Sequence, residues 1–224
     1  MNIAIDGPSG AGKSTVAKIL SKRLGIVYLD TGAMYRAVGL KAYRAGISPM
    51  DAESVGRMLA GTKIDIVYDN GFQKVLLDHE DVSVEIRAHH ISKYASDVSK
   101  IHAVRLAMVG LQREIAAKAD SVLDGRDIGT FVLPNAEYKF FLTADVVERA
   151  KRRFLELKAK GAECNLSEIE RDIAARDYND STRDFAPLKK ADDAVIVDST
   201  CLSIDGTVEK MLSCIKYSGL GNKA

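Results

Sequence analysis

The sequence lacks a surplus of charge and any long apolar run, and each absence excludes a class of protein. Its 32 Lys and Arg residues balance 31 Asp and Glu residues, so bulk charge does not favour binding to a nucleic-acid polymer. No apolar run approaches the roughly 20 residues that span a bilayer, and the first residues lack the pattern of a signal peptide. We therefore expect no nucleic-acid polymer and no membrane as partner, and a cytoplasmic location.

Cysteine is also scarce. Cys164, Cys201 and Cys214 are odd in number and show no CxxC spacing, which argues against a disulfide framework and a zinc site. We expect them to be reduced packing residues. The chain has 224 residues, of which 46% are hydrophobic, enough for one well-filled domain with one or two small appendages.

Short apolar runs alternate with longer helical patterns. The runs are bounded by turn or cap residues and are apolar throughout, as expected for strands covered on both faces. Helical spacing of apolar residues follows at 14–24 and 102–119. This alternation predicts an α/β fold with a doubly wound parallel sheet. The expected strands are 2–6, 26–30, 121–125, 139–144 and 194–198.

Two regions interrupt the alternation. Residues 63–86 predict a small antiparallel sheet, with strands at 64–68 and 73–78 joined by the turn "DNG". Residues 151–176 predict a charged helix, a break near Gly161 and a second charged helix. Because this second region has little apolar stripe, we expect it to pack loosely and to move.

The stretch "GPSGAGKST" follows the first expected strand and precedes a helix. Gly7, Gly12, Lys13 and Ser14 satisfy the pattern GxxxxGK[ST], which surrounds phosphate groups with backbone N–H groups at a helix N-terminus. Lys13 can bridge the outer phosphates of a nucleotide, and the Ser14 hydroxyl can touch a bound magnesium ion. Asp124, at a strand end, holds magnesium through water or caps the loop, and the sequence leaves both roles open.

Arginines recur beyond the expected strand ends. A guanidinium matches phosphate oxygens, so such a set favours a second phosphate-bearing ligand. The case is strongest for Arg126, which lies in "DGRDIGT" at the carboxyl end of a central strand, where ligands bind in open α/β sheets. The set comprises Arg36, Arg105, Arg126, Arg149, Arg152, Arg153, Arg176 and Arg183.

With these motifs, the sequence resembles the bacterial cytidylate kinases, within the nucleoside-monophosphate kinases. The resemblance covers nearly the whole chain and depends on "IDGPSGAGKST", "LDTGAMYRA", "VSVEIR", "YASDVSKIHAVR", "LDGRDIGT", "RDYNDSTR" and "VIVDST". It implies a P-loop fold with a five-stranded parallel sheet, a β insert in the monophosphate-binding domain, and a short helical lid. The implied divisions are a core of 1–34, 101–150 and 177–224, a monophosphate-binding domain of 35–100, and a lid of 151–176.

The resemblance also implies roles for individual residues. Arg36 and Arg126 would hold the CMP phosphate, and Ser96, Arg105 and Asp127 would recognise cytosine. Catalysis would depend on Lys13, Arg126, Arg176 and Arg183, and Ser14 would be the metal ligand. The remaining CMP contacts would be Thr31, Tyr35, Arg176, Asp180 and Arg183. ATP would contact Gly7, Pro8, Ser9, Gly10, Ala11, Gly12, Lys13, Ser14, Thr15 and Arg153.

The implied reaction transfers the γ-phosphoryl group of ATP, with Mg²⁺, to CMP and dCMP in pyrimidine metabolism, by a monomeric enzyme. A carboxylate beside a guanidinium complements the amine and acceptors of cytosine, whereas uracil would place an acceptor against Asp127. Two alternatives stay open at this point. One is another small P-loop kinase that acts on shikimate or UMP, and the other is a nucleotide-binding regulatory protein without transfer activity.

Overall fold

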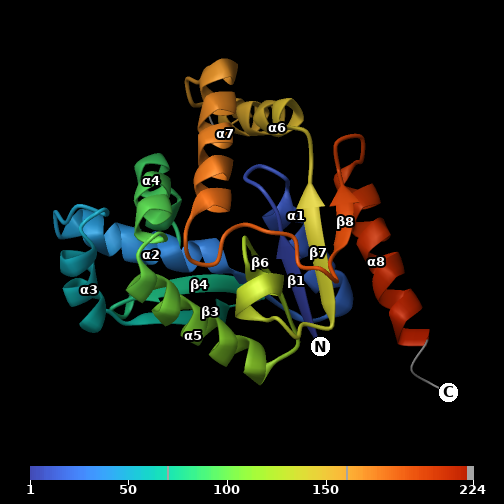
Figure 1. The fold of residues 1–224 in the computed structure, drawn as a ribbon, viewed down its shortest axis with the longest axis horizontal. Coiled ribbons are helices and arrows are strands. Elements are labelled where there is room, and N and C mark those ends of the chain that lie inside the picture. Colours follow the sequence, from blue (N-terminus) through green and yellow to red (C-terminus); the bar gives the residue numbers. More distant parts are fainter. Residues whose placement is uncertain (70, 160, 221–224) are drawn as a thin grey trace. The chain divides into compact units, whose positions relative to one another are not determined.

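The computed structural model describes residues 1–69, 71–159 and 161–220 (Figure 1). The chain divides into two compact units. The first unit contains residues 1–26 and 120–224, and the second contains residues 27–119. In the described part of the chain, no helix has the length and apolar character needed to cross a membrane.

The main sheet has five strands in the order β2-β6-β1-β7-β8. β1 pairs in parallel with β6 and with β7, and β7 pairs in parallel with β8. The strands occupy the predicted runs to within a residue because these runs are apolar and buried; Ile3, Ile5 and Leu123 are fully buried. The predicted α/β fold with a parallel sheet is confirmed. The bounds are β1 Asn2–Asp6, β2 Val27–Asp30, β6 Ser121–Gly125, β7 Tyr138–Thr143 and β8 Val195–Asp198.

Helices of the first unit pack around its strands. α1 (Lys13–Leu24) contacts β1 and β6, and α8 (Ile204–Leu220) contacts α1 and β8. α1 ends at Gly25, whose φ of 68° is the left-handed conformation that favours glycine. A short π-helix, η2 (Ile128–Val132), follows β6.

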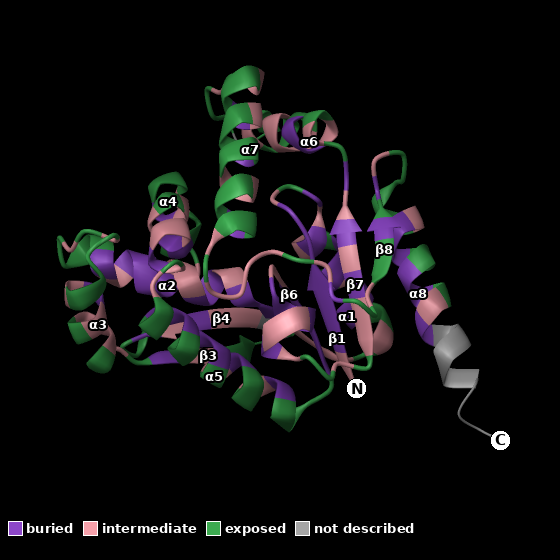
Figure 2. Ribbon diagram, in the orientation of Figure 1, coloured by how far each residue is buried: buried purple, intermediate pink, exposed green. Residues whose placement is uncertain are grey.

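The charged region after β7 forms a helical pair, α6 (Val146–Ala159) and α7 (Leu166–Thr182), with the break where it was predicted. The expectation of loose packing was incomplete. Ala150 of α6 packs with Ile169 and Ile173 of α7 in a small apolar cluster that also includes Phe154. Four-residue spacing places Ala150 and Phe154 on one face of α6, whereas the rest of α7 is largely exposed (Figure 2).

The second unit is built around α2, which packs against α4 through Gly39. A Cβ at Gly39 would lie 2.9 Å from the backbone nitrogen of Ala95, so only glycine permits this approach. The predicted antiparallel insert is confirmed, with Ile64 opposite Leu77, and its predicted turn includes Asn70, outside the described residues. The elements are α2 Thr31–Arg44, α3 Ala52–Ala60, β3 Ile64–Asp69, β4 Phe72–Leu77, β5 Glu80–Asp81, η1 Glu85–Arg87, α4 His89–Val98 and α5 His102–Lys118.

Two expectations were wrong. β8 is not covered on both faces: Val195 and Ile196 are 42% and 55% exposed, because this strand lies at the edge of the sheet. Cys201 is exposed and is therefore not a packing residue, whereas Cys164 and Cys214 are half-buried. None of the three cysteines forms a disulfide within the described residues, as expected.

Candidate active site

The phosphate-binding loop connects β1 to α1. Gly7, Gly10 and Gly12 have φ values of 148°, 76° and 88°, which other residues rarely adopt. A Cβ at Gly7 would overlap the carbonyl oxygen of Leu142. No side chain in the described part of the chain caps α1, so the helix N-terminus and its partial positive charge are available to an anion.

Lys13 lies in this loop with only 6% of its surface exposed. Its Nζ donates a hydrogen bond of 2.7 Å to the carbonyl oxygen of Pro8. Burial lowers the pKa of Lys13 well below its usual value, and the nearby Arg126 guanidinium lowers it further. A phosphate group would stabilise the charged amine, so this loop is electrostatically suited to an anionic ligand.

Ser14 and Asp124 place two oxygen ligands side by side. The Ser14 hydroxyl donates to Asp124 Oδ2 over 2.8 Å, and Asp124 is buried at the end of β6. A hydroxyl beside a carboxylate is the donor type that Mg²⁺ prefers. Among the described residues, no cluster of three or more His, Cys, Asp or Glu could hold a metal by itself.

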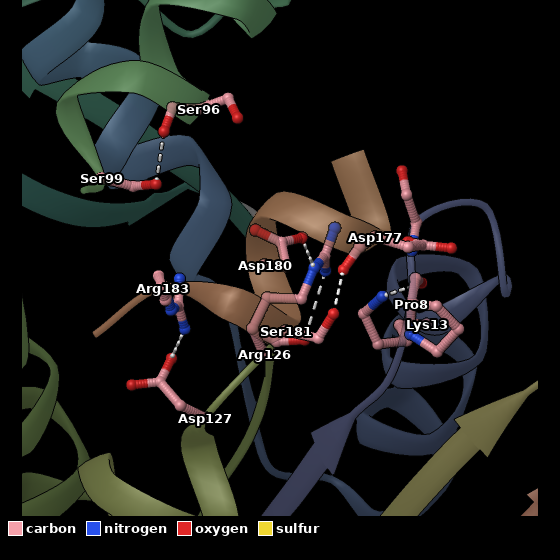
Figure 3. A network of polar contacts seen from close by, with 12 residues as sticks. Pro8, Lys13, Ser96, Ser99, Arg126, Asp127, Asp177, Asp180, Ser181 and Arg183 are labelled. Atoms are coloured by element: carbon pink, nitrogen blue, oxygen red, sulfur yellow. Dashed lines mark hydrogen bonds and ion pairs between the residues drawn. The ribbon is translucent and has the colours of Figure 1, made fainter. Parts of the chain in front are cut away.

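Two arginine–carboxylate pairs with little solvent exposure connect the residues after β6 with the C-terminal end of α7 (Figure 3). Arg126 Nε lies 2.6 Å from Asp180 Oδ2, and Arg183 Nη2 lies 3.2 Å from Asp127 Oδ1. Burial alone would raise the pKa of Asp180, but the charge and hydrogen bond of Arg126 outweigh burial and lower it, helped by Arg176 and Arg183. The structure thus brings together five of the predicted CMP contacts, namely Arg126, Asp127, Arg176, Asp180 and Arg183.

Ser9 is held through its backbone by the helical pair. Its N–H donates to Asp177 Oδ1 of α7 over 2.8 Å, and its carbonyl oxygen accepts from Arg149 Nη1 of α6 over 2.7 Å. Arg149 also pairs with Asp177. Sequence reasoning noted Arg149 only as one arginine of a set and missed Asp177, although Asp177 lies within "RDYNDSTR".

A second residue that sequence reasoning missed is Asp6, at the end of β1. Its two carboxylate oxygens accept hydrogen bonds of 2.7 Å from the backbone N–H groups of Ile128 and Gly129. Burial raises the pKa of Asp6 to about 6, although the two amide bonds act in the opposite direction. The available signal was a carboxylate in an apolar strand directly before the phosphate-binding loop.

The second unit contains a separate charged cluster at the start of α2. Asp30 is buried and accepts from the backbone N–H of Ala33 over 2.9 Å, which caps the helix. Arg36 Nη1 and Arg87 Nη2 lie 3.9 and 2.9 Å from the two Asp30 oxygens. Burial would raise the pKa of Asp30, but both arginines outweigh it and lower it. Arg36 Nη1 has no hydrogen-bond partner among the described residues, which leaves it suited to an anion.

The other predicted residues of the second unit lie on three helices. Thr31 is buried at the first turn of α2, and Ser96 lies on α4, where its carbonyl oxygen accepts from Ser99 (Figure 3). Arg105 of α5 is 1% exposed, and its guanidinium lies 5.7 Å from the ring centre of Tyr35. In the first unit, Arg153 is partly exposed on α6 and pairs with Glu156 at 2.8 Å.

A strand, a glycine-rich phosphate-binding loop with a buried lysine, and a following helix define the class of P-loop nucleotide-binding proteins. Solved structures share this fold at low sequence identity. A shikimate kinase from Bacteroides thetaiotaomicron aligns with a TM-score of 0.51 at 12% identity, covering 96% of this chain and 98% of that one. At this identity the likeness establishes the fold alone.

Sequence relatives are much closer. A cytidylate kinase from Caldicellulosiruptor bescii is 54% identical over 95% of this chain and 94% of its own length. A cytidylate kinase from Lactobacillus johnsonii is 50% identical over 96% of this chain and 94% of its own length. The family model for cytidylate kinase matches residues 3–217. The chain belongs to the cytidylate kinase family, whose members are ATP-dependent nucleoside-monophosphate kinases.

Proposed function

We propose that this protein transfers the γ-phosphoryl group of ATP to CMP and dCMP, giving ADP and CDP or dCDP. The observation that supports this function best is the buried Lys13 in a glycine-rich phosphate-binding loop, in a chain of the cytidylate kinase family. We propose that the enzyme acts in the cytoplasm, in pyrimidine metabolism. We further propose that it acts as a monomer.

In this reaction the protein forms no covalent bond with the transferred group. A phosphate oxygen of CMP attacks the γ-phosphorus of ATP, and the bond to the β–γ bridging oxygen breaks as ADP leaves. The attacking oxygen is already anionic, so no general base is needed. Catalysis then consists of positioning the two phosphates and neutralising their charge. Lys13 supplies a charge at the donor phosphates once its Nζ exchanges the Pro8 carbonyl for phosphate oxygens.

On the acceptor side we propose that Arg36 and Arg126 hold the CMP phosphate. Ser96, Arg105 and Asp127 recognise cytosine, with the Asp127 carboxylate accepting from the exocyclic amine. Asp180, Arg176 and Arg183 contact the sugar and the phosphates, while Thr31 and Tyr35 complete the CMP contacts. The pairs Arg126–Asp180 and Arg183–Asp127 support this assignment, because each holds a charged group in place before a ligand arrives.

For ATP we propose contacts from the loop residues Gly7 to Thr15 and from Arg153, with residues 151–176 as a mobile lid. Residues 35–100 form the proposed monophosphate-binding domain. Mg²⁺ would be held by Ser14, with Asp124 bound to it or acting through water; it would supply charge neutralisation at the transferring phosphoryl group. The 2.8 Å contact between Ser14 and Asp124 supports this placement.

A coupled assay of ADP production tests the function. The purified protein is given ATP and Mg²⁺ with CMP, dCMP, UMP, AMP or shikimate. We expect the highest kcat/KM for CMP and dCMP. Preference for shikimate, AMP or UMP would replace the proposal with another P-loop kinase activity. Activity on none of the acceptors would favour a regulatory nucleotide-binding protein.

A further inference from the structure

Asp6 makes a contact that joins the phosphate-binding loop to the loop after β6. Its two oxygens accept from two consecutive backbone amides, those of Ile128 and Gly129, each over 2.7 Å. Arg126 and Asp127 directly precede these amides, and Gly7 directly follows Asp6. One carboxylate thus fixes the backbone next to two proposed CMP contacts.

The surroundings of Asp6 leave little room for another arrangement. Asp6 is 4% exposed. A Cβ at Gly129 would lie 3.2 Å from the side chain of Lys139, tighter than most real contacts, and would touch Asp6 Oδ2 at 3.4 Å. Both carboxylate oxygens are used, and an ionised carboxylate is a strong acceptor for each of two N–H groups. Retaining such a buried charge is costly, so the contact requires a reason beyond packing.

We propose that Asp6 is a positioning residue of this enzyme: through the amides of Ile128 and Gly129 it sets the backbone position of Arg126 and Asp127. The inference rests on the proposed function, since it concerns the CMP side of that site. Asp6 does not touch the substrate. It acts by holding the loop in the geometry in which Arg126 meets phosphate and Asp127 meets the base.

The protonation of Asp6 makes this role measurable as a dependence of the kinetics on pH. Burial raises the pKa of Asp6 to about 6; Asp127 favours the protonated form and Lys13 the ionised one. Lys139, whose stem packs on Gly129, is paired with Asp193. The carboxyl is therefore ionised above about pH 6 and protonated below. A protonated carboxyl loses one of its two strong acceptor positions, so the loop is held less firmly in acid.

The test compares wild type with Asp6→Asn between pH 5 and 8, with ATP and CMP varied separately. We expect the KM for CMP to rise about tenfold or more at pH 8, with the KM for ATP changed less than about twofold. The advantage of wild type should shrink as pH falls through about 6, because Asp6 itself becomes neutral. The CMP phosphate also titrates near pH 6. Because this affects wild type and Asp6→Asn equally, it cancels in the ratio of their kcat/KM values.

Glu137→Gln is the matched control, because Glu137 accepts a backbone N–H at the opposite end of β1, from Asn2; it should leave both KM values unchanged. If Asp6→Asn does not fold, Gly129→Ala disturbs the same contact from the other side and should raise the KM for CMP selectively. Equal effects on ATP and CMP, a ratio constant with pH, or an unchanged KM for CMP would overturn the inference. A wild type inactive on CMP would overturn the proposed function instead.

Discussion

Replacing Asp127 by Asn should change which base the enzyme accepts. In the proposed site, the wild-type carboxylate accepts the cytosine amine but would face the O4 acceptor of uracil. An unpaired, desolvated acceptor costs on the order of 1–3 kcal/mol, or about tenfold to a few hundredfold in selectivity. An amide can turn its NH₂ group toward O4, so the CMP preference should fall by about this factor.

The structure adds a second consequence, because Asp127 is also paired with the buried Arg183 at 3.2 Å. The uncharged amide of Asp127→Asn would hold the Arg183 guanidinium less firmly than the carboxylate does. This loss affects CMP and UMP alike, so it lowers both kcat/KM values without changing their ratio. We therefore expect activity on CMP to fall by much more than activity on UMP, with both below wild type.

The assay measures kcat/KM for CMP and UMP at saturating ATP in wild type, Asp127→Asn and Asp180→Asn. Asp180→Asn is the matched control, because it weakens the other arginine–carboxylate pair, Arg126–Asp180, without touching the proposed base contact. It should lower both values and keep their ratio within about twofold. If Asp127→Asn also keeps the wild-type ratio, Asp127 only organises the loop and base recognition lies elsewhere.

Three further predictions concern the phosphate-binding loop, helix packing and the lid. Lys13→Ala should lower kcat by several orders of magnitude with little change in thermal unfolding, since a charge on the transferring phosphate is worth several kcal/mol; near-normal turnover would remove Lys13 from the mechanism. Gly39→Ala should destabilise the fold by about 1–3 kcal/mol and raise the KM for CMP by shifting α4 and Ser96, whereas Gly56→Ala, whose Cβ meets nothing within 4 Å, should do neither. Residues 151–176 should exchange amide hydrogens quickly except near Ile169 and Ile173, and slowly with ATP and CMP bound; equal exchange in both states would contradict a mobile lid.

The sequence predicted elements with local signals and missed contacts between distant residues. β1, the phosphate-binding loop and α1 were predictable because apolar strand, glycines and helical spacing lie within one short segment. The contacts of Asp6 with Ile128 and of Asp177 with Ser9 join residues 122 and 168 positions apart, and no local pattern encodes them. The exposure of β8 was missed for the same reason, since strand order decides which strand becomes an edge.

At position 9 the contacts with Asp177 and Arg149 constrain the backbone and not the side chain. Asp177 and Arg149 bind its N–H and its carbonyl oxygen, and neither of these bonds uses its hydroxyl. Any residue with a backbone N–H preserves both bonds, whereas proline would remove one of them. The side chain at position 9 can therefore be replaced without loss of the mechanical connection between the phosphate-binding loop and the helical pair.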